Sequence, residues 1–196
     1  MKNIVLAAVL AAPFATAAAA APEAYALNES HSQIVFSYNH AGFSTTYGMF
    51  SGFGGDIMFD AEDPAASTVS VTFPAESMIT GWDARSGHFL QSGDFFKLGE
   101  FPDVTFESTS IEVTGDATAN ITGDLTLNGV TQSVVLETVL NAQTEEYPFP
   151  PYQGSKAIGL DATVTLNRSD YNLGMFAPFI PNEIPLAISI EAVAAQ

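Results

Sequence analysis

Apolar and polar residues alternate with a period of two through much of the chain. From position 158 to position 166 every even residue is apolar, and the odd residues between them are glycine, aspartate or threonine. Residues 119–127 and 186–191 repeat this alternation, as do the shorter stretches 69–73 and 104–106. The pattern is typical of antiparallel strands that bury one face and expose the other. The chain is therefore predicted to be all-β.

Turn-forming residues separate these stretches and set the number of strands. Segments such as "AEDPAAS" at 61–67, "LNGVT" at 127–131 and "PFPPYQG" at 148–154 contain glycine, proline, asparagine or aspartate, residues that favour turns. Between such segments the sequence predicts eight strands, near residues 33–40, 47–59, 67–75, 103–113, 117–127, 133–140, 156–166 and 184–193.

Eight antiparallel strands in one small domain leave exposed edges unless the sheet closes on itself. We therefore expect an eight-stranded antiparallel, lipocalin-like barrel, whose interior holds side chains or one small ligand. A two-sheet sandwich is the alternative, but the long strands and the lack of a Cys-Trp-Cys pattern favour the barrel. Only Gly81 to Gly99 lacks alternation, and we expect it to form a short helical segment that caps one end.

The first two predicted strands combine bulky side chains with missing ones. Phe36 and Tyr38 share one face of the first strand, whereas Gly48 lies near Phe50 and Phe53 on the second. Glycines in a strand either let it bend or leave space for a close neighbour. Because the chain also contains 15 phenylalanines, we expect a cavity lined by rings. An apolar cavity holds an apolar ligand or stays empty.

The first 21 residues have the features of a secretory signal peptide. Lys2 precedes an apolar run from Ile4 to Ala12, and Ala19 to Ala21 resemble a cleavage site. The apolar run is too short to span a bilayer. We expect residues 1–21 to be removed on export, and residues 22–196 to form one soluble domain without stable membrane insertion.

The charge of the exported chain limits the classes of molecule that it can bind. Without residues 1–21, 4 basic and 22 acidic side chains remain, a formal charge of −18. Such a surface repels nucleic acid and anionic headgroups, so nucleic acid is not expected as a partner. The chain contains no cysteine, and an exported domain without disulfides depends on its hydrophobic core.

The candidate chemistry is sparse. His31 and His40 are separated by roughly 30 Å of extended strand and differ in parity, so we expect no shared metal ion and no cofactor. His31 is expected to make a structural hydrogen bond, whereas His88, close to Arg85 and Asp94, is the better functional candidate. No G-x-S-x-G nucleophile motif occurs.

Five blocks of the sequence resemble the YceI-like family of exported bacterial proteins. They are "HSQIVFSYNHAGFSTTYGMFSGFGGDIMFD", "ITGWDARSGHFLQSGDFF", "FPDVTFESTSIEV", "ITGDLTLNGVTQSVVLE" and "LNRSDYNLG", and they follow the family's order over roughly residues 25–193. Ser86 is a departure, because the family commonly has an acidic residue directly after the arginine that corresponds to Arg85.

The resemblance implies an extended barrel around a long hydrophobic pocket, in a periplasmic binding or carrier protein rather than an enzyme. The implied partner is an isoprenoid or other long-chain lipid, such as a prenyl phosphate or an isoprenoid quinone, and a homodimer is compatible with the sequence. Two alternatives stay open. One is an enzyme that acts on a lipid-linked substrate through His88 and Arg85, and the other is a stress or interaction protein with a filled barrel.

Residues for lipid contact are expected from the bulky strand face and from residues 81–99, which would form the lid of the pocket or a plain end cap. Arg85 and His88 would lie nearest a polar headgroup, since the guanidinium fork suits an anion. Arg168, beside Asp170, is predicted to form a structural ion pair. The predicted lipid-binding residues are Phe36, Tyr38, Phe50, Phe53, Trp82, Arg85, His88, Phe89, Phe95, Phe96, Phe106 and Leu127.

Overall fold

The computed structural model describes residues 21–194, so all of the predicted signal peptide except Ala21 lies outside the described residues. The strands are β1 (Glu23–Leu27), β2 (Gln33–His40), β3 (Ser44–Ser51), β4 (Gly54–Phe59), β5 (Thr68–Pro74), β6 (Asp103–Gly115), β7 (Thr118–Leu127), β8 (Val130–Thr144), β9 (Ala157–Asn167) and β10 (Glu183–Ala194). The α-helix is α1 (Asp83–Gln91), and 3-10 turns occupy η1 (Glu29–His31), η2 (Pro64–Ala66), η3 (Ala75–Ser77) and η4 (Arg168–Tyr171).

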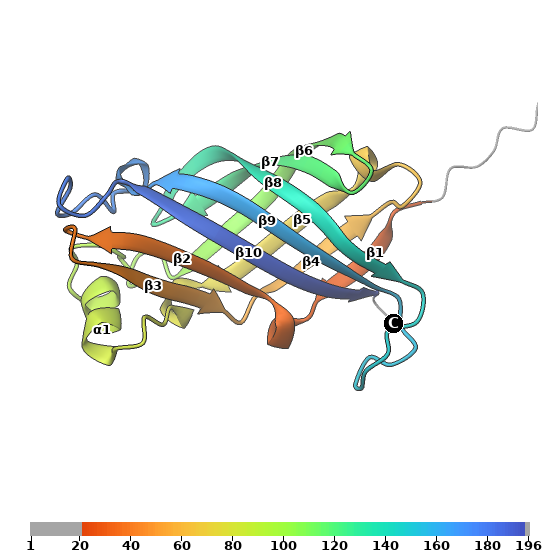
Figure 1. The fold of residues 1–196 in the computed structure, drawn as a ribbon, viewed down its shortest axis with the longest axis horizontal. Coiled ribbons are helices and arrows are strands. Elements are labelled where there is room, and N and C mark those ends of the chain that lie inside the picture. The colour runs from red at the N-terminus through yellow and green to blue at the C-terminus, as the bar shows by residue number, and fades with distance from the viewer. Residues whose placement is uncertain (1–20, 195–196) are drawn as a thin grey trace, which may run out of the picture.

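The strands close into an antiparallel barrel. Hydrogen-bonded neighbours follow the order β1-β4-β5-β6-β7-β8-β9-β10, and β1 pairs back with β10 to complete the ring. β2 also pairs with β10, and β3 pairs with β2, so β1 and β2 act as one interrupted strand and β3 and β4 as another. The prediction of an eight-stranded lipocalin-like barrel is confirmed (Figure 1).

The predicted strand 47–59 is wrong in detail, because the structure has two strands, β3 and β4, separated by a break at this place. Gly52 has a φ of +76° between β3 and β4, a conformation that glycine adopts at little cost. The break turns Phe53 into the core, where its side chain is 0% exposed. The prediction also missed β1, whose five residues are too few for a clear alternation.

The alternation places the apolar face of each strand inside the barrel, as predicted. Leu160, Val164 and Leu166 on β9 point inward, as do Leu186 and Ile188 on β10. These two strands pair over most of their length, with Leu186 opposite Val164 and Ile188 opposite Ala162. A two-residue period therefore puts matching apolar rows side by side in the interior.

Residues 81–99 lie at one end of the barrel, and the predicted short helix is confirmed as α1 (Figure 1). The helix ends at Gln91 with Ser92 as its C-cap, and Gly93 follows with a φ of +79°, the left-handed conformation common after a helix C-terminus. Phe95 beyond it is buried in the main core. None of the helices within residues 21–194 is long and apolar enough to cross a membrane.

Candidate functional site

A cavity of about 710 Å³ runs through the barrel interior toward the α1 end. Its lining is mostly apolar and comes from all ten strands, with further residues from α1 and the loops at that end. Trp82 and Phe176 belong to this lining and are also exposed to solvent, so the cavity reaches the surface there. The volume is within the range of about 300–1,000 Å³ that is typical of small-molecule pockets.

The structure brings all the predicted lipid-binding residues together around this one cavity. They come from strands β2, β3, β6 and β7, from the β3–β4 break and from the α1 segment. The residues that line it are Phe36, Tyr38, Phe50, Phe53, Trp82, Arg85, His88, Phe89, Phe95, Phe96, Phe106 and Leu127. Their contact with a lipid stays a prediction.

Two interior glycines explain why the strands combine phenylalanines with residues that have no side chain. Phe36 and Gly48 are cross-strand partners, and the Phe36 ring occupies the place where a Cβ of Gly48 would stand. The ring of Phe106 covers Gly123 in the same way. Each glycine lets a phenylalanine lie flat along the barrel wall instead of projecting across the interior, and a flat ring leaves the interior open.

An aromatic cluster lies where the cavity meets the α1 end. Phe89 packs edge-on against Phe95 and Tyr38, with ring centroids 5.0 and 6.1 Å apart. His88 stacks on Phe89 and contacts the edge of Phe95, and Phe176 approaches both His88 and Phe95. The α1 segment therefore turns its aromatic side toward the cavity, as the lid interpretation requires.

Arg85 is the cation at the cavity with unused donors. Its Nη2 donates to the backbone oxygen of Thr80 at 2.6 Å, and its buried Nε has no partner. Ser86, the residue after Arg85, hydrogen-bonds with the Thr80 hydroxyl at 3.0 Å. Among residues 21–194, no carboxylate lies within ion-pair distance of Arg85, and this leaves the guanidinium available to an anion.

His88 lies beside this arginine on α1. Its Nε2 is 3.2 Å from Asp94 Oδ2, and both side chains are partly exposed. The predicted proximity of His88 and Asp94 is confirmed. His40 also lines the cavity at this end, whereas His31 lies at the other end of β2. Within residues 21–194, no cluster of three or more His, Cys, Asp or Glu side chains could hold a metal ion.

Arg168 is buried, but the predicted ion pair with Asp170 is wrong. Nε donates to Pro181 O at 2.8 Å, Nη1 donates to Met175 O at 2.8 Å and to Leu173 O, and Nη2 donates to Ile180 O at 2.8 Å. One guanidinium thus binds four backbone carbonyls of the loop between η4 and β10. Burial lowers the pKa of this guanidinium.

The same region contains Tyr171, which the sequence reasoning also missed. Its side chain is among the most deeply buried in the protein. Burial, with a smaller contribution from the charge of Asp170, raises the pKa of its phenol to about 12. The phenol therefore stays neutral at any ordinary pH. The available signal was the apolar segment "YNLGMFAPFIP" between two predicted strands.

Asn128 connects the β7–β8 turn to the α1 segment. Asn128 and Gly129 have φ values of 52° and 78°, as in the Asn-Gly turns that suit two-residue hairpins. The buried Asn128 side chain donates to Tyr171 O at 3.0 Å and accepts from the Lys97 N–H at 2.9 Å. The turn therefore holds the segment that follows Phe95 against the barrel.

Replacing Asn128 with glycine should lower the free energy of unfolding by about 1–3 kcal/mol, because buried backbone groups lose their partners while the turn keeps its backbone conformation. Urea denaturation measures the change. Asn172→Gly is the matched control, since exposed Asn172 also has a left-handed φ of 60°, and it should change stability by less than about 0.5 kcal/mol. Equal losses in both variants would assign the effect to backbone entropy and contradict our explanation.

A polar cluster closes the opposite end of the barrel. Glu191 on β10 accepts from Asn28 Nδ2 at 2.5 Å and from Tyr147 OH at 2.9 Å, and His31 Nδ1 lies 3.6 Å from the same carboxylate. The buried Asn28 also contacts His31 Nδ1 at 3.0 Å. The expected structural hydrogen bond of His31 is confirmed. Glu191 joins three segments that are distant in sequence.

Comparison with known proteins places this fold in a family. The sequence pattern of the YceI-like domain matches residues 25–192. A UPF0312 protein of Ectopseudomonas mendocina is 36% identical over 195 residues, and the alignment covers 98% of both chains. The protein YceI of Escherichia coli O6:H1 is also 36% identical over 195 residues, with the same coverage. The chain belongs to the YceI-like family.

Solved structures share the YceI-like fold. The Campylobacter jejuni YceI protein has a TM-score of 0.67 and 27% identity, covering 76% of this chain and 85% of that one. Burkholderia cenocepacia BcnA has a TM-score of 0.73 at 19% identity, covering 84% and 98% of the two chains. A polyisoprenoid-binding domain from Saccharophagus degradans, implicated in plant cell wall breakdown, has a TM-score of 0.67 at 15% identity, covering 88% and 99%. At the lower identities the likeness concerns the fold alone.

Proposed function

We propose that this YceI-like protein binds and carries a long apolar lipid in the periplasm, with the lipid chain inside the barrel. The observation that carries the proposal is the apolar cavity of about 710 Å³ that reaches the surface at the α1 end. Burial of an apolar chain there removes its surface from water, at a gain of roughly 25 cal/mol per Å². The cavity also argues against the alternative of a barrel filled with side chains.

The arrangement of polar groups supports a lipid with a polar or anionic headgroup at the α1 end. Arg85 and His88 lie there beside the exposed Trp82, and Arg85 has donors free for an anion. The strands line the cavity with apolar side chains such as Leu125 and Val164, which suit a hydrocarbon chain. A polyisoprenoid, as a prenyl phosphate or a quinone, fits both features.

The name of one structural neighbour agrees with this ligand class, because the Saccharophagus degradans domain is described as polyisoprenoid-binding. Export to the periplasm rests on the signal-like residues 1–21. Binding without turnover is the simpler role. His88 has a carboxylate partner, but it is not hydrogen-bonded to any serine or threonine hydroxyl within residues 21–194.

Blocking the cavity tests the proposal. Val164 points into the cavity, so Val164→Trp should weaken retention of a prenyl lipid by about tenfold or more, which a steric cost of about 1.4 kcal/mol would suffice to produce. Native mass spectrometry of protein purified after export, or loaded with a polyprenol from detergent, measures retention. The matched control is Thr163→Trp, because Thr163 is the exposed neighbour on the same strand.

The proposal predicts that the control keeps its lipid and that both variants keep the circular dichroism of the parent. Equal retention by the two tryptophan variants would place the lipid outside the barrel. A parent protein that takes up no prenyl, quinone or acyl lipid from detergent would contradict the proposed function itself.

A further inference from the structure

We propose that the α1 end of the barrel docks on the surface of a neutral lipid bilayer through two apolar loops, 41–43 and 174–180. This docking rests on the proposed lipid-carrying function and adds to it the place where the lipid is taken up or released. The contact is peripheral, because only the loop tips meet the bilayer and the barrel stays in water.

The two loops expose large apolar side chains to solvent. Phe43 at the β2–β3 turn is 89% exposed, and Phe179 before β10 is 75% exposed. Met175 and Phe176 are also exposed, and Trp82 at the start of α1 is 64% exposed. Aromatic side chains of this kind are favoured at the boundary between lipid and water.

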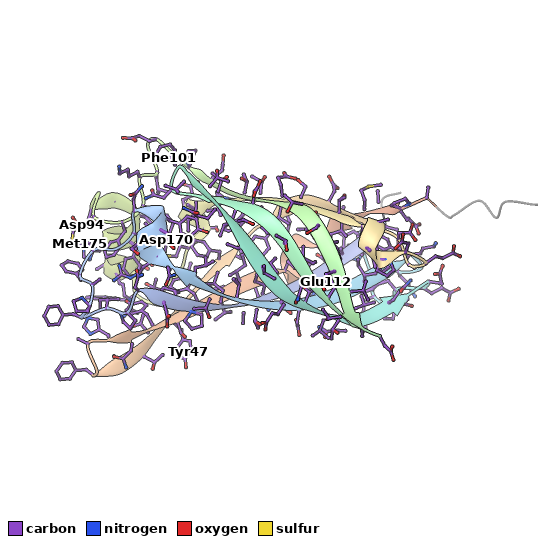
Figure 2. The ribbon with its side chains drawn as sticks, turned by 90° about the horizontal axis from the view of Figure 1, so that it is seen from above. Tyr47, Asp94, Phe101, Glu112, Asp170 and Met175 are labelled. Atoms are coloured by element: carbon purple, nitrogen blue, oxygen red, sulfur yellow. The ribbon has the colours of Figure 1, made fainter. Side chains whose placement is uncertain are left out.

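These side chains lie at one end of the molecule. The β2–β3 turn, α1 and the loop before β10 share the same end of the barrel in Figure 1. Figure 2 shows Met175 next to Asp94 at this end, whereas Glu112 lies toward the other. Residues that are far apart in the sequence therefore form one apolar rim, defined as Phe43, Trp82, Met175, Phe176 and Phe179.

The distribution of charge favours a bilayer at this end over the other. The chain has 22 acidic residues, yet 30–55 and 171–182 contain none, and these segments include both loops. The acids at this end include Asp83 and Asp94 on the α1 segment, where Asp94 is paired with His88, and the exposed Asp170 and Glu183 on either side of the 171–182 segment. The opposite end has exposed acids at its turns, among them Glu62, Asp63, Asp116, Glu145 and Glu146.

The apolar rim is continuous with the cavity. Phe176 belongs to the rim, contacts Phe95 in the aromatic cluster and lines the cavity together with Ile180. A hydrocarbon chain that leaves a bilayer beneath the rim would enter the barrel along apolar side chains. This route avoids exposing the chain to water, which is the main energetic obstacle to lipid transfer.

The loops are held in place although their tips are exposed. Arg168 binds four carbonyls of the loop between η4 and β10, and the Asn39 side chain accepts from the Gly42 N–H at 2.5 Å in the β2–β3 turn. Loops that are already ordered lose little entropy on binding. The formal charge of −18 that remains without residues 1–21 opposes anionic lipids, so we propose a neutral surface.

The single tryptophan of the chain makes the proposal testable, because Trp82 belongs to the rim. We expect its fluorescence to shift to shorter wavelength with phosphatidylcholine vesicles and to be quenched by brominated phosphatidylcholine. In flotation assays, Phe43→Ser combined with Phe179→Ser should weaken vesicle binding by about tenfold or more. Neither residue lines the cavity, so uptake of a polyprenol from detergent should not change.

Phe149→Ser is the matched control, since Phe149 is 63% exposed and lies in the β8–β9 loop at the other end. It should bind vesicles like the parent. Equal losses in the control and the double variant would overturn the proposal, as would a parent protein that binds polyprenol but no vesicles. So would sedimentation showing a dimer that the double variant abolishes, because a second copy would then occupy the rim.

Failure of the docking proposal is distinguishable from failure of the proposed function. Uptake of polyprenol from detergent tests the cavity without any bilayer, whereas flotation with empty vesicles tests the rim without any ligand. A protein that fails the first assay and passes the second keeps the rim and loses the carrier role.

Discussion

Replacing Arg168 with methionine should lower the free energy of unfolding by about 3–5 kcal/mol, as expected when one side of a buried charged network is removed. The Arg168 side chain is 8% exposed, so water does not readily replace it at the four carbonyls that it binds. Urea denaturation followed by circular dichroism measures the loss. The effect should exceed that of most single substitutions.

The control is Asp170→Asn, because it removes the neighbouring carboxylate and keeps the side-chain shape. Arg168 donates to backbone carbonyls and not to Asp170, so this control should change stability by less than about 0.5 kcal/mol. A loss in Asp170→Asn as large as in Arg168→Met would restore the ion pair that the sequence suggested.

Phe53→Ala should also cost about 3–5 kcal/mol, because the ring is 0% exposed and leaves a closed cavity when it is removed. Phe53 packs edge-on against Phe73 with ring centroids 5.0 Å apart. Phe36→Ala should cost less, about 1–3 kcal/mol, because the Phe36 ring borders the open cavity and has fewer packing partners.

Chemical denaturation of the two variants side by side measures this difference. Each change removes one phenyl ring from the barrel interior. A difference between the two losses therefore reports how tightly each ring is packed. Equal, full-size losses at Phe36 and Phe53 would mean that the barrel is packed solid in solution, and the proposed binding cavity would then be wrong.

Much of the fold follows from local sequence. The alternation in β9 and β10 identified both strands and their inward faces, because side chains on a strand alternate between two sides whatever the strand pairs with. The lack of alternation between Gly81 and Gly99 identified the helical segment in the same way. Rings such as Phe36 and Phe106 could be assigned to the interior because they share a face with other apolar residues.

Contacts between distant segments could not be obtained in this way. Arg168 stands beside Asp170 in the sequence, yet its partners are carbonyls up to thirteen positions away. Which carbonyls turn toward a guanidinium depends on how the loop folds over it, and carbonyls carry no sequence signal because every residue has one. The same holds for the Asn128 side chain, whose partners lie in the α1 segment and η4.

The sequence by itself determined most of the strands, their buried faces, the barrel class and the set of rings inside, because a two-residue period and turn chemistry act locally. Only the tertiary structure decided that Phe36 and Phe106 lie flat over Gly48 and Gly123, and so leave the cavity open. It also decided that Phe43 and Phe179 belong to one rim. The closure of the barrel brings their loops to the same end, and closure depends on the pairing of β1 with β10, which lie at opposite ends of the chain.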